Sequence, residues 1–367
     1  MSVESRTNTL HHEISKKDRN AQVYELINLG VDVDALVDGK TALHKAVESN
    51  NFSVLGTLYS EGPSFEITDN NGLTPLARAV TISSDGIDSS LTGDNQIVES
   101  LIERMIVENA NLSLYSGEGL SPMLIASKYG NTQIIDLLVE ADDSTVNDVD
   151  SFGRNGVHLA AMQNHPTVIY QLVKLGARKN QRDNYGESPL ILAVKSTQNE
   201  AKNKGFESFH VLLLSNVDIR IPDTKHGWTA LHYAVYLGQK YIIDQLVKKD
   251  NSVLELRTVR GGWTPLHIAV MKNDNNIIRF MIKHGSNVNA KTSNNQNVFH
   301  LAAGKNNTGI LADFVELNVN INLLDDTKQT PIHIAASKKL FRMSNQLEEY
   351  GADVTVLGFP SPEIIES

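Results

Sequence analysis

Cysteine is absent from this chain of 367 residues. Its absence excludes disulfide bonds, thiolate metal sites and a cysteine nucleophile together. A chain that forms no disulfides is suited to a reducing compartment, and we expect it in the cytoplasm.

Long hydrophobic runs are missing as well. No window of about 18 apolar residues occurs, so a transmembrane helix is not expected. Residues 1–20 are polar and lack the apolar segment of a secretory signal peptide. We therefore expect a soluble protein with no membrane insertion.

Positive charge is in deficit. The chain has 33 Lys and Arg residues against 43 Asp and Glu residues, which gives a formal net charge of -10. An acidic surface repels the phosphates of DNA and RNA, so nucleic acid is not expected as a partner.

The motifs of common enzyme sites are also absent. No GxxxxGK[ST], HExxH or GxSxG motif occurs, and no GxGxxG lies between a predicted strand and helix. Asp85, Asp88 and Asp94 cluster in one segment, but they do not alternate as the ligands of a calcium loop do. We expect no catalytic residues, no cofactor, no metal and no enzyme activity.

What the chain does contain is one phrase of eight residues that recurs along its length. The spacing between successive copies is mostly 33 or 34 residues, and a degenerate first copy lies at 8–14. The other copies are KTALHKAV (40–47), LTPLARAV (73–80), LSPMLIAS (120–127), RNGVHLAA (154–161), ESPLILAV (187–194), WTALHYAV (228–235), WTPLHIAV (263–270), QNVFHLAA (296–303) and QTPIHIAA (329–336).

The residue types of the phrase predict a helix. A Thr hydroxyl caps the first turn, and Pro is favourable there because its missing N–H has no partner in any case. A second helix is indicated by apolar residues at helical spacing, as in Ile277, Ile278, Met281 and Ile282, and it ends at Gly285. The Asn-rich stretches between copies are typical of turns.

The phrase resembles the T-P-L-H-x-A core of the ankyrin repeat. The resemblance covers residues 7–356 in about ten copies and implies an all-α repeat solenoid. In that family, helix-turn-helix pairs carry β-hairpin fingers and stack into a curved superhelix. We expect tails at 1–6 and 357–367 and no attached effector domain. The family also implies that the histidine of the phrase bonds to neighbouring backbone; these are His11, His44, His158, His232, His267, His300 and His333.

Two copies carry insertions between their first and second helices. Residues 81–95 are rich in Ser, Asp and Gly, and we expect an exposed loop. Residues 196–208 are polar and are compatible with a helical extension capped at Gly205. Insertions of this kind lie on a functional face or are tolerated drift, and both alternatives remain open.

A binding surface is predicted from the first residue of each copy, just before the T-P-L-H core, which in the family points outward from the finger. Both tryptophans of the chain occupy this position in adjacent copies. Trp, Tyr and Arg dominate the energetics of protein interfaces. The alternative is that each indole packs on its own finger and stabilises it. We expect a partner to contact the concave face at Phe152, Tyr185, Glu187, His226, Trp228, Tyr236, Leu237, Arg260, Trp263, Met271 and Lys272.

The resemblance implies a protein–protein interaction module, and we expect a monomeric cytoplasmic scaffold or inhibitor that binds a protein partner. One alternative is an ankyrin-only effector that an intracellular bacterium secretes into a host cytoplasm to target a host protein. The abundance of Asn and the acidic-hydrophobic tail, with Glu363 and Glu366 around Ile364 and Ile365, favour this alternative. A second alternative is a subunit of a larger enzyme or channel assembly.

Overall fold

The computed structural model describes residues 3–16, 19–85, 95–117, 119–197 and 206–355. The described residues form twenty α-helices and a few short 3-10 helices, and they contain no strand. Two compact units are present: residues 1–184 with 203–217, and residues 185–202 with 218–367. We call them unit 1 and unit 2. None of the described helices is long and apolar enough to cross a membrane.

Unit 1 consists of the helices of the first five repeats together with one later helix. They are α1 (Val3–Ile14), α2 (Asn20–Asn28), α3 (Ala42–Glu48), α4 (Leu55–Tyr59), α5 (Pro75–Asp85), α6 (Asn95–Val107), α7 (Pro122–Tyr129), α8 (Thr132–Ala141), α9 (Gly156–Gln163), α10 (Pro166–Lys174) and α12 (Glu207–Leu214).

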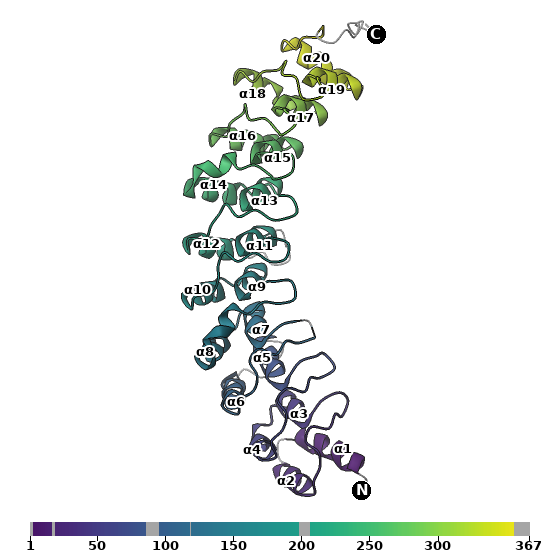
Figure 1. Cartoon of the computed structure of the whole chain (residues 1–367), viewed down its shortest axis with the longest axis vertical. Coiled ribbons are helices and arrows are strands. Elements are labelled where there is room, and N and C mark those ends of the chain that lie inside the picture. Colours follow the sequence, from purple (N-terminus) through teal and green to yellow (C-terminus); the bar gives the residue numbers. More distant parts are fainter. Residues whose placement is uncertain (1–2, 17–18, 86–94, 118, 198–205, 356–367) are drawn as a thin grey trace. The chain divides into compact units, whose positions relative to one another are not determined.

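Unit 2 consists of the remaining helices. They are α11 (Pro189–Ser196), α13 (Ala230–Tyr236), α14 (Lys240–Lys249), α15 (Pro265–Met271), α16 (Asn275–Lys283), α17 (Val298–Gly304), α18 (Leu311–Glu316), α19 (Pro331–Ser337) and α20 (Phe341–Glu349). Within each unit the odd-numbered helices lie beside the long loops, and the even-numbered helices lie on the other side (Figure 1). We call the odd-numbered helices inner, the even-numbered helices outer, and the long loops fingers.

The capping of the inner helices follows from the recurring phrase. In α15 the Thr264 side chain and the His267 ring form a reciprocal capping box, and Pro265 stands in the first turn. Ala269 is fully buried, which lets the inner helices α13 and α15 pack against each other. Small residues at this position are therefore required for stacking, as the sequence predicts.

The core of each repeat lies between its two helices. In the eighth repeat, Leu266 and Val270 of α15 are buried together with Ile277, Ile278 and Met281 of α16. Burial of one such side chain stabilises the fold by roughly 1.5–3 kcal/mol relative to its exposure. The buried positions are those that the helical spacing predicts.

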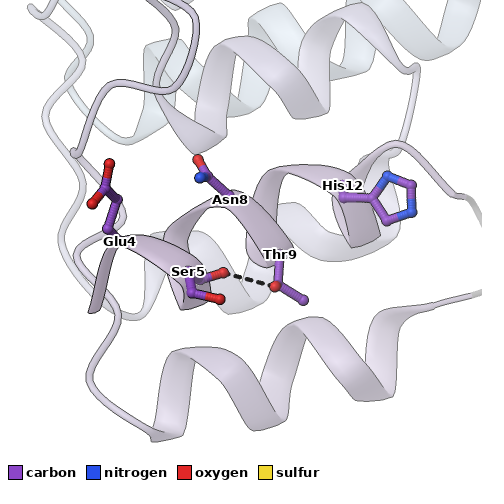
Figure 2. A pocket seen from close by; sticks show the side chains of 5 residues that line it. All are labelled: Glu4, Ser5, Asn8, Thr9 and His12. Atoms are coloured by element: carbon purple, nitrogen blue, oxygen red, sulfur yellow. Dashed lines mark hydrogen bonds between the residues drawn. The ribbon is translucent and has the colours of Figure 1, made fainter. Parts of the chain in front are cut away.

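Helix α1 covers the amino-terminal end of unit 1. Its buried face includes Leu10 and Ile14, whereas the opposite face is polar. Figure 2 shows this polar face, a shallow surface lined by Glu4, Ser5, Asn8, Thr9 and His12, on which the Thr9 hydroxyl donates to the Ser5 carbonyl. The helix begins at Val3, so the predicted tail at 1–6 is wrong for residues 3–6.

The first insertion differs from its prediction. Helix α5 continues to Asp85, so residues 81–85 are helical rather than a loop. The extension is held because Ser83 is buried and accepts a hydrogen bond from Asn131 Nδ2 at 3.1 Å. Residues 86–94 of this insertion, residues 198–205 of the second with its predicted cap at Gly205, and the tail at 357–367 lie outside the described residues.

The fingers are tight loops, not the expected β-hairpins. In the finger of the fifth repeat, the Asp150 N–H donates to the Arg154 carbonyl at 2.9 Å. The Asp150 carboxylate accepts from the N–H groups of Phe152 and Arg154, both at 2.9 Å. Only isolated bridges occur in the described fingers. In the finger of the fifth repeat, the Asp150 carboxylate takes donors that a strand ladder would use.

Candidate interaction surface

Successive fingertips of unit 2 are joined by backbone hydrogen bonds. Gly227 makes a close approach here: a Cβ atom on it would lie 2.4 Å from the Val259 nitrogen, and its φ is +70°. Only glycine fits this position without strain. The bonds run from Thr224 N to Tyr185 O (2.9 Å), from Ser293 N to Gly261 O (2.8 Å) and from Asp326 N to Asn294 O (3.1 Å).

Trp228 stands beside this row of fingertips, where it is half-buried against the inner helix of its own repeat. Its ring centroid lies 5.2 Å from that of Tyr233, edge-on, and 5.3 Å from that of Tyr236. The ring of His226, at the fingertip, lies 5.6 Å away. The indole therefore links the finger to helix α13 and leaves part of its surface exposed.

Tyr236 extends this aromatic surface toward the next repeat, where its ring is in contact with Lys272. Its side chain is 42% exposed, and the Lys272 Nζ atom lies over its ring at 4.1 Å from the centroid. A cation over an exposed aromatic face contributes about 0.5–1 kcal/mol. Trp228, Tyr236 and Lys272 thus form one continuous surface across two repeats, which we call the Trp228 surface.

Trp263 is also half-buried, and it packs within its own finger. A Cβ atom on Gly261 would lie 2.8 Å from the indole Nε1, so the ring rests on the bare backbone of this glycine. The indole again contacts its own repeat and remains partly open to solvent.

The other predicted residues of unit 2 are placed along the same row. His226, Arg260 and Tyr185 are exposed at fingertips, and Leu237 and Met271 are half-buried at the ends of inner helices. Phe152 belongs to unit 1, where the Arg154 guanidinium lies over its ring at 4.7 Å. The structure therefore places the predicted residues of unit 2 along one row of fingers and inner helices, and Phe152 is a finger residue of the other unit.

Glu187 does not point outward as expected. The residue is only 9% exposed, and its carboxylate accepts a hydrogen bond from Lys195 Nζ at 2.6 Å. Lys195 in turn lies over the ring of Tyr233 at 5.3 Å. Glu187 therefore supports the Trp228 surface from below and is not itself presented to a partner.

The pairing of Glu187 with Lys195 has counterparts in three other repeats. In each of these repeats the first residue of the phrase packs on the residue eight positions later, at the end of the inner helix of the same repeat. The pairs are Lys40 with Glu48 (2.8 Å), Arg154 with Met162 (3.5 Å), Glu187 with Lys195 (2.6 Å) and Trp228 with Tyr236 (5.3 Å between centroids). The identity of this residue is thus coupled to a second position.

Sequence reasoning missed the residues that hold the finger of Trp228 in place. The Tyr233 hydroxyl donates to Asp223 Oδ2 at 2.6 Å, and Asp223 Oδ1 accepts from the N–H groups of His226 and Gly227. Burial, together with the Asp223 carboxylate, raises the pKa of Tyr233 well above its usual range, so the phenol stays protonated and keeps donating. The sequence does contain a signal for this contact: an Asp in the finger and a Tyr four residues after the Thr of the phrase.

The histidines of the phrase are structural where their bonds are described. The Thr264 N–H donates to His267 Nδ1 at 3.1 Å, so the proton is on Nε2, which donates to the Ala290 carbonyl at 3.1 Å. His44, His232 and His300 bond in the same way to the carbonyls of Leu73, Trp263 and Gln329. These bonds confirm the expected contact with neighbouring backbone. Burial lowers the pKa of His232 and of His267 to about 4.

Unit 1 has a second surface feature that the sequence analysis did not identify. Two open grooves of about 250 Å³ and about 460 Å³ share Leu120 and Lys128 between them. The larger is also lined by Phe152, Arg154 and Met162. The apolar first residues of two copies of the phrase, Leu73 and Leu120, are the signal that could have indicated it.

A sequence model of the family described as "Ankyrin repeats (3 copies)" matches residues 87–183 and 199–292, which make up more than half of the chain. Human neurogenic locus notch homolog protein 1 is 27% identical over 180 residues, which are 48% of this chain and 6% of that protein. Alpha-latrotoxin-Lg1a of Latrodectus geometricus is 25% identical over 174 residues, 46% of this chain and 12% of that protein. The chain therefore spans a small part of the length of these relatives.

Among solved structures, the ankyrin repeat domain of Bcl-3, described as a unique member of the IkappaB protein family, is similar to this chain. It is 22% identical, with a TM-score of 0.54, and the match covers 62% of this chain and 99% of that structure. This likeness shows the fold.

Proposed function

This chain belongs to the ankyrin-repeat family, whose repeats serve as protein–protein interaction modules, and we propose that it binds its protein partner through the Trp228 surface of unit 2. Its action is binding rather than catalysis. We further propose a cytoplasmic monomer that acts as a scaffold or an inhibitor and has no nucleic-acid partner.

One observation carries the proposal. Trp228, Tyr236 and Lys272 form a partly exposed aromatic and cationic surface across two repeats, with Trp263 in the following finger. Exposed aromatic surface is unfavourable in water unless a partner covers it. Trp and Tyr at the centre of an interface each contribute upwards of about 2 kcal/mol when they are desolvated.

The packing of each indole on its own repeat is compatible with this role. A binding residue that is already held in one conformation loses less entropy when a partner docks. Because Tyr233, Tyr236 and Glu187 with Lys195 support Trp228 from beneath, its exposed edge is pre-organised.

The test is affinity capture with the full chain and with the variant Trp228→Ala/Trp263→Ala, after circular dichroism has shown equal helical content. The matched control replaces two exposed aromatic side chains of outer helices, Tyr170→Ala/Phe341→Ala. We expect the tryptophan variant, but not the control, to lose a specific partner. Retention of the same partners by both variants would count against the Trp228 surface.

A second variant controls for the possibility that the tryptophan variant loses its partner because its fold is disturbed. Tyr236→Ser/Lys272→Ser keeps both tryptophans in the chain and removes the 42% exposed ring of Tyr236 and the exposed Lys272 side chain. It should lose the same partner. The identity and source of that partner then distinguish a scaffold from a bacterial effector acting on a host protein and from a subunit of an assembly with fixed stoichiometry.

A further inference from the structure

Charge is distributed unevenly between the face of unit 2 and the rest of the chain. The whole chain has more acidic than basic residues, 43 against 33. The fingers and inner helices of three successive repeats, residues 222–237, 257–272 and 291–305, contain a single acidic residue, Asp223. The same stretches contain six basic residues: Lys225, Arg257, Arg260, Lys272, Lys291 and Lys305.

The one acidic group of this face is not available to neutralise the basic ones. Asp223 is only 3% exposed, and its carboxylate accepts hydrogen bonds from Tyr233 and from the finger backbone. Glu255 and Asp274 flank these stretches, but their carboxylates accept hydrogen bonds from backbone N–H groups outside them. Glu255 accepts from the Asn287 N–H, and Asp274 caps helix α16.

The basic groups are exposed and lack acidic partners. Arg257 donates to the carbonyls of Gly262 and Lys291, and Lys272 lies over Tyr236. Within the part of the chain that the structure describes, no ion pair includes any of the six. The exposed charge of this face is therefore of one sign.

We propose that this face recognises an acidic peptide segment of the partner, one that carries an aromatic or aliphatic side chain among its carboxylates. The inference rests on the proposed function, since it concerns the same surface. The apolar side chain packs between Trp228, Tyr236 and Met271, and the carboxylates pair with Lys225, Arg260 and Lys272. Charge complementarity of this kind sets specificity and accelerates association.

A peptide fits this face better than a nucleic acid does. Bases stack on open aromatic faces, whereas the half-buried Trp228 ring already contacts Tyr233 edge-on and Tyr236 at a tilt and presents only part of its surface. A nucleic acid also carries a phosphate at every nucleotide and would extend beyond the basic stretches onto a chain of net charge -10. A peptide confines its negative charge to a short segment.

The test is a selection of random peptides, displayed with their coding RNA, on the full chain. The charge-reversal variant is Arg260→Glu/Lys272→Glu, and the control is Lys240→Glu/Lys283→Glu, which makes the same change of charge on the outer helices α14 and α16. We expect the enriched peptides to be acidic and to contain an aromatic or aliphatic residue. For an enriched peptide, we expect the Kd to rise about tenfold or more in the reversal variant and less than about twofold in the control.

The binding should also weaken as the salt concentration increases from roughly 50 to 300 mM, because exposed charges are screened. Enriched peptides that are neutral or basic, or a Kd that the reversal leaves unchanged, would overturn the inference. The proposed function would still stand if those peptides required Trp228 and Trp263. Equal enrichment on the chain and on Trp228→Ala/Trp263→Ala would overturn both. A thymidine oligonucleotide of about 20 nucleotides, bound at micromolar concentration and released by the reversal, would favour nucleic acid instead.

Discussion

The ring of Trp228 lies 5.3 Å from the ring of Tyr236, which is eight residues later at the end of the same inner helix. The equivalent pairs in two other repeats are ionic, namely Lys40 with Glu48 and Glu187 with Lys195. The seventh repeat therefore replaces an ion pair by two aromatic rings at one structural position. The two rings form part of the Trp228 surface.

The contact between Trp228 and Tyr236 is expected to contribute to stability as a pair. Aromatic pairs add about 0.5–1.5 kcal/mol beyond the area they bury. A double-mutant cycle with Trp228→Ala and Tyr236→Ala, measured by urea unfolding, should give a coupling free energy in this range. A cycle of Trp228→Ala with Phe341→Ala, on the distant helix α20, is the control and should be additive. Additivity in the first cycle would show that the rings do not support each other.

Acid should destabilise the fold between about pH 6.5 and pH 4. His232 and His267 have a pKa of about 4 when folded, against 6.5 for the unfolded chain, because burial disfavours the charged imidazole. The unfolded state therefore binds more protons in this window, and the free energy of unfolding falls as the pH falls. Once the pH is below both the folded and the unfolded pKa, each histidine lowers the free energy of unfolding by up to about 3 kcal/mol.

Urea unfolding at intervals of pH measures this dependence. The variant His267→Gln lacks one of the histidines whose pKa is lowered by burial, so its unfolding free energy should change less steeply with pH between 6.5 and 5. His12→Gln, on the exposed face of α1, is the control and should keep the slope of the parent chain. An unchanged slope in His267→Gln would contradict the assignment.

The contact between fingertips can be separated from backbone strain by two glycine substitutions. Gly227 and Gly285 both have positive φ, but a Cβ would meet the Val259 backbone at Gly227 and nothing within 4 Å at Gly285. Gly285→Ala should cost only the strain of the backbone conformation, about 1 kcal/mol. Gly227→Ala should cost roughly 1–3 kcal/mol more, because the finger must move. Equal changes in the urea midpoint would show that the fingertips tolerate separation.

Local rules account for the parts of the structure that could be predicted. The cap at Thr264, the proline at 265 and the apolar spacing of Ile277, Ile278 and Met281 are determined within a few residues of the chain. The histidine contacts could be predicted because the histidine recurs with the repeat and each ring reaches a backbone carbonyl further along the chain, Ala290 for His267 and Gln329 for His300. The inward turn of Glu187 could not, since it depends on Lys195 at the far end of the helix.

The continuation of helix α5 through residues 81–85 was mispredicted for a similar reason. Ser, Asp and Gly favour loops by local propensity, but the burial of Ser83 and its bond to Asn131 outweigh that preference. Propensity is a weak influence when tertiary contacts are available. The contact joins residues 48 positions apart, so no local pattern indicates it.

The sequence by itself determined the repeat, the helix pairs, the structural role of the histidines and the placement of both tryptophans beside fingers, because each depends on period and on neighbours within one repeat. Only the tertiary structure decided which side chains of this surface are exposed to solvent and which are buried by contacts with the inner helices. Trp228 and Tyr236 stay partly exposed, whereas Glu187 and Asp223 are buried by partners from the inner helices. Exposure is a property of packing, and packing is established by residues that the chain brings together only when it folds.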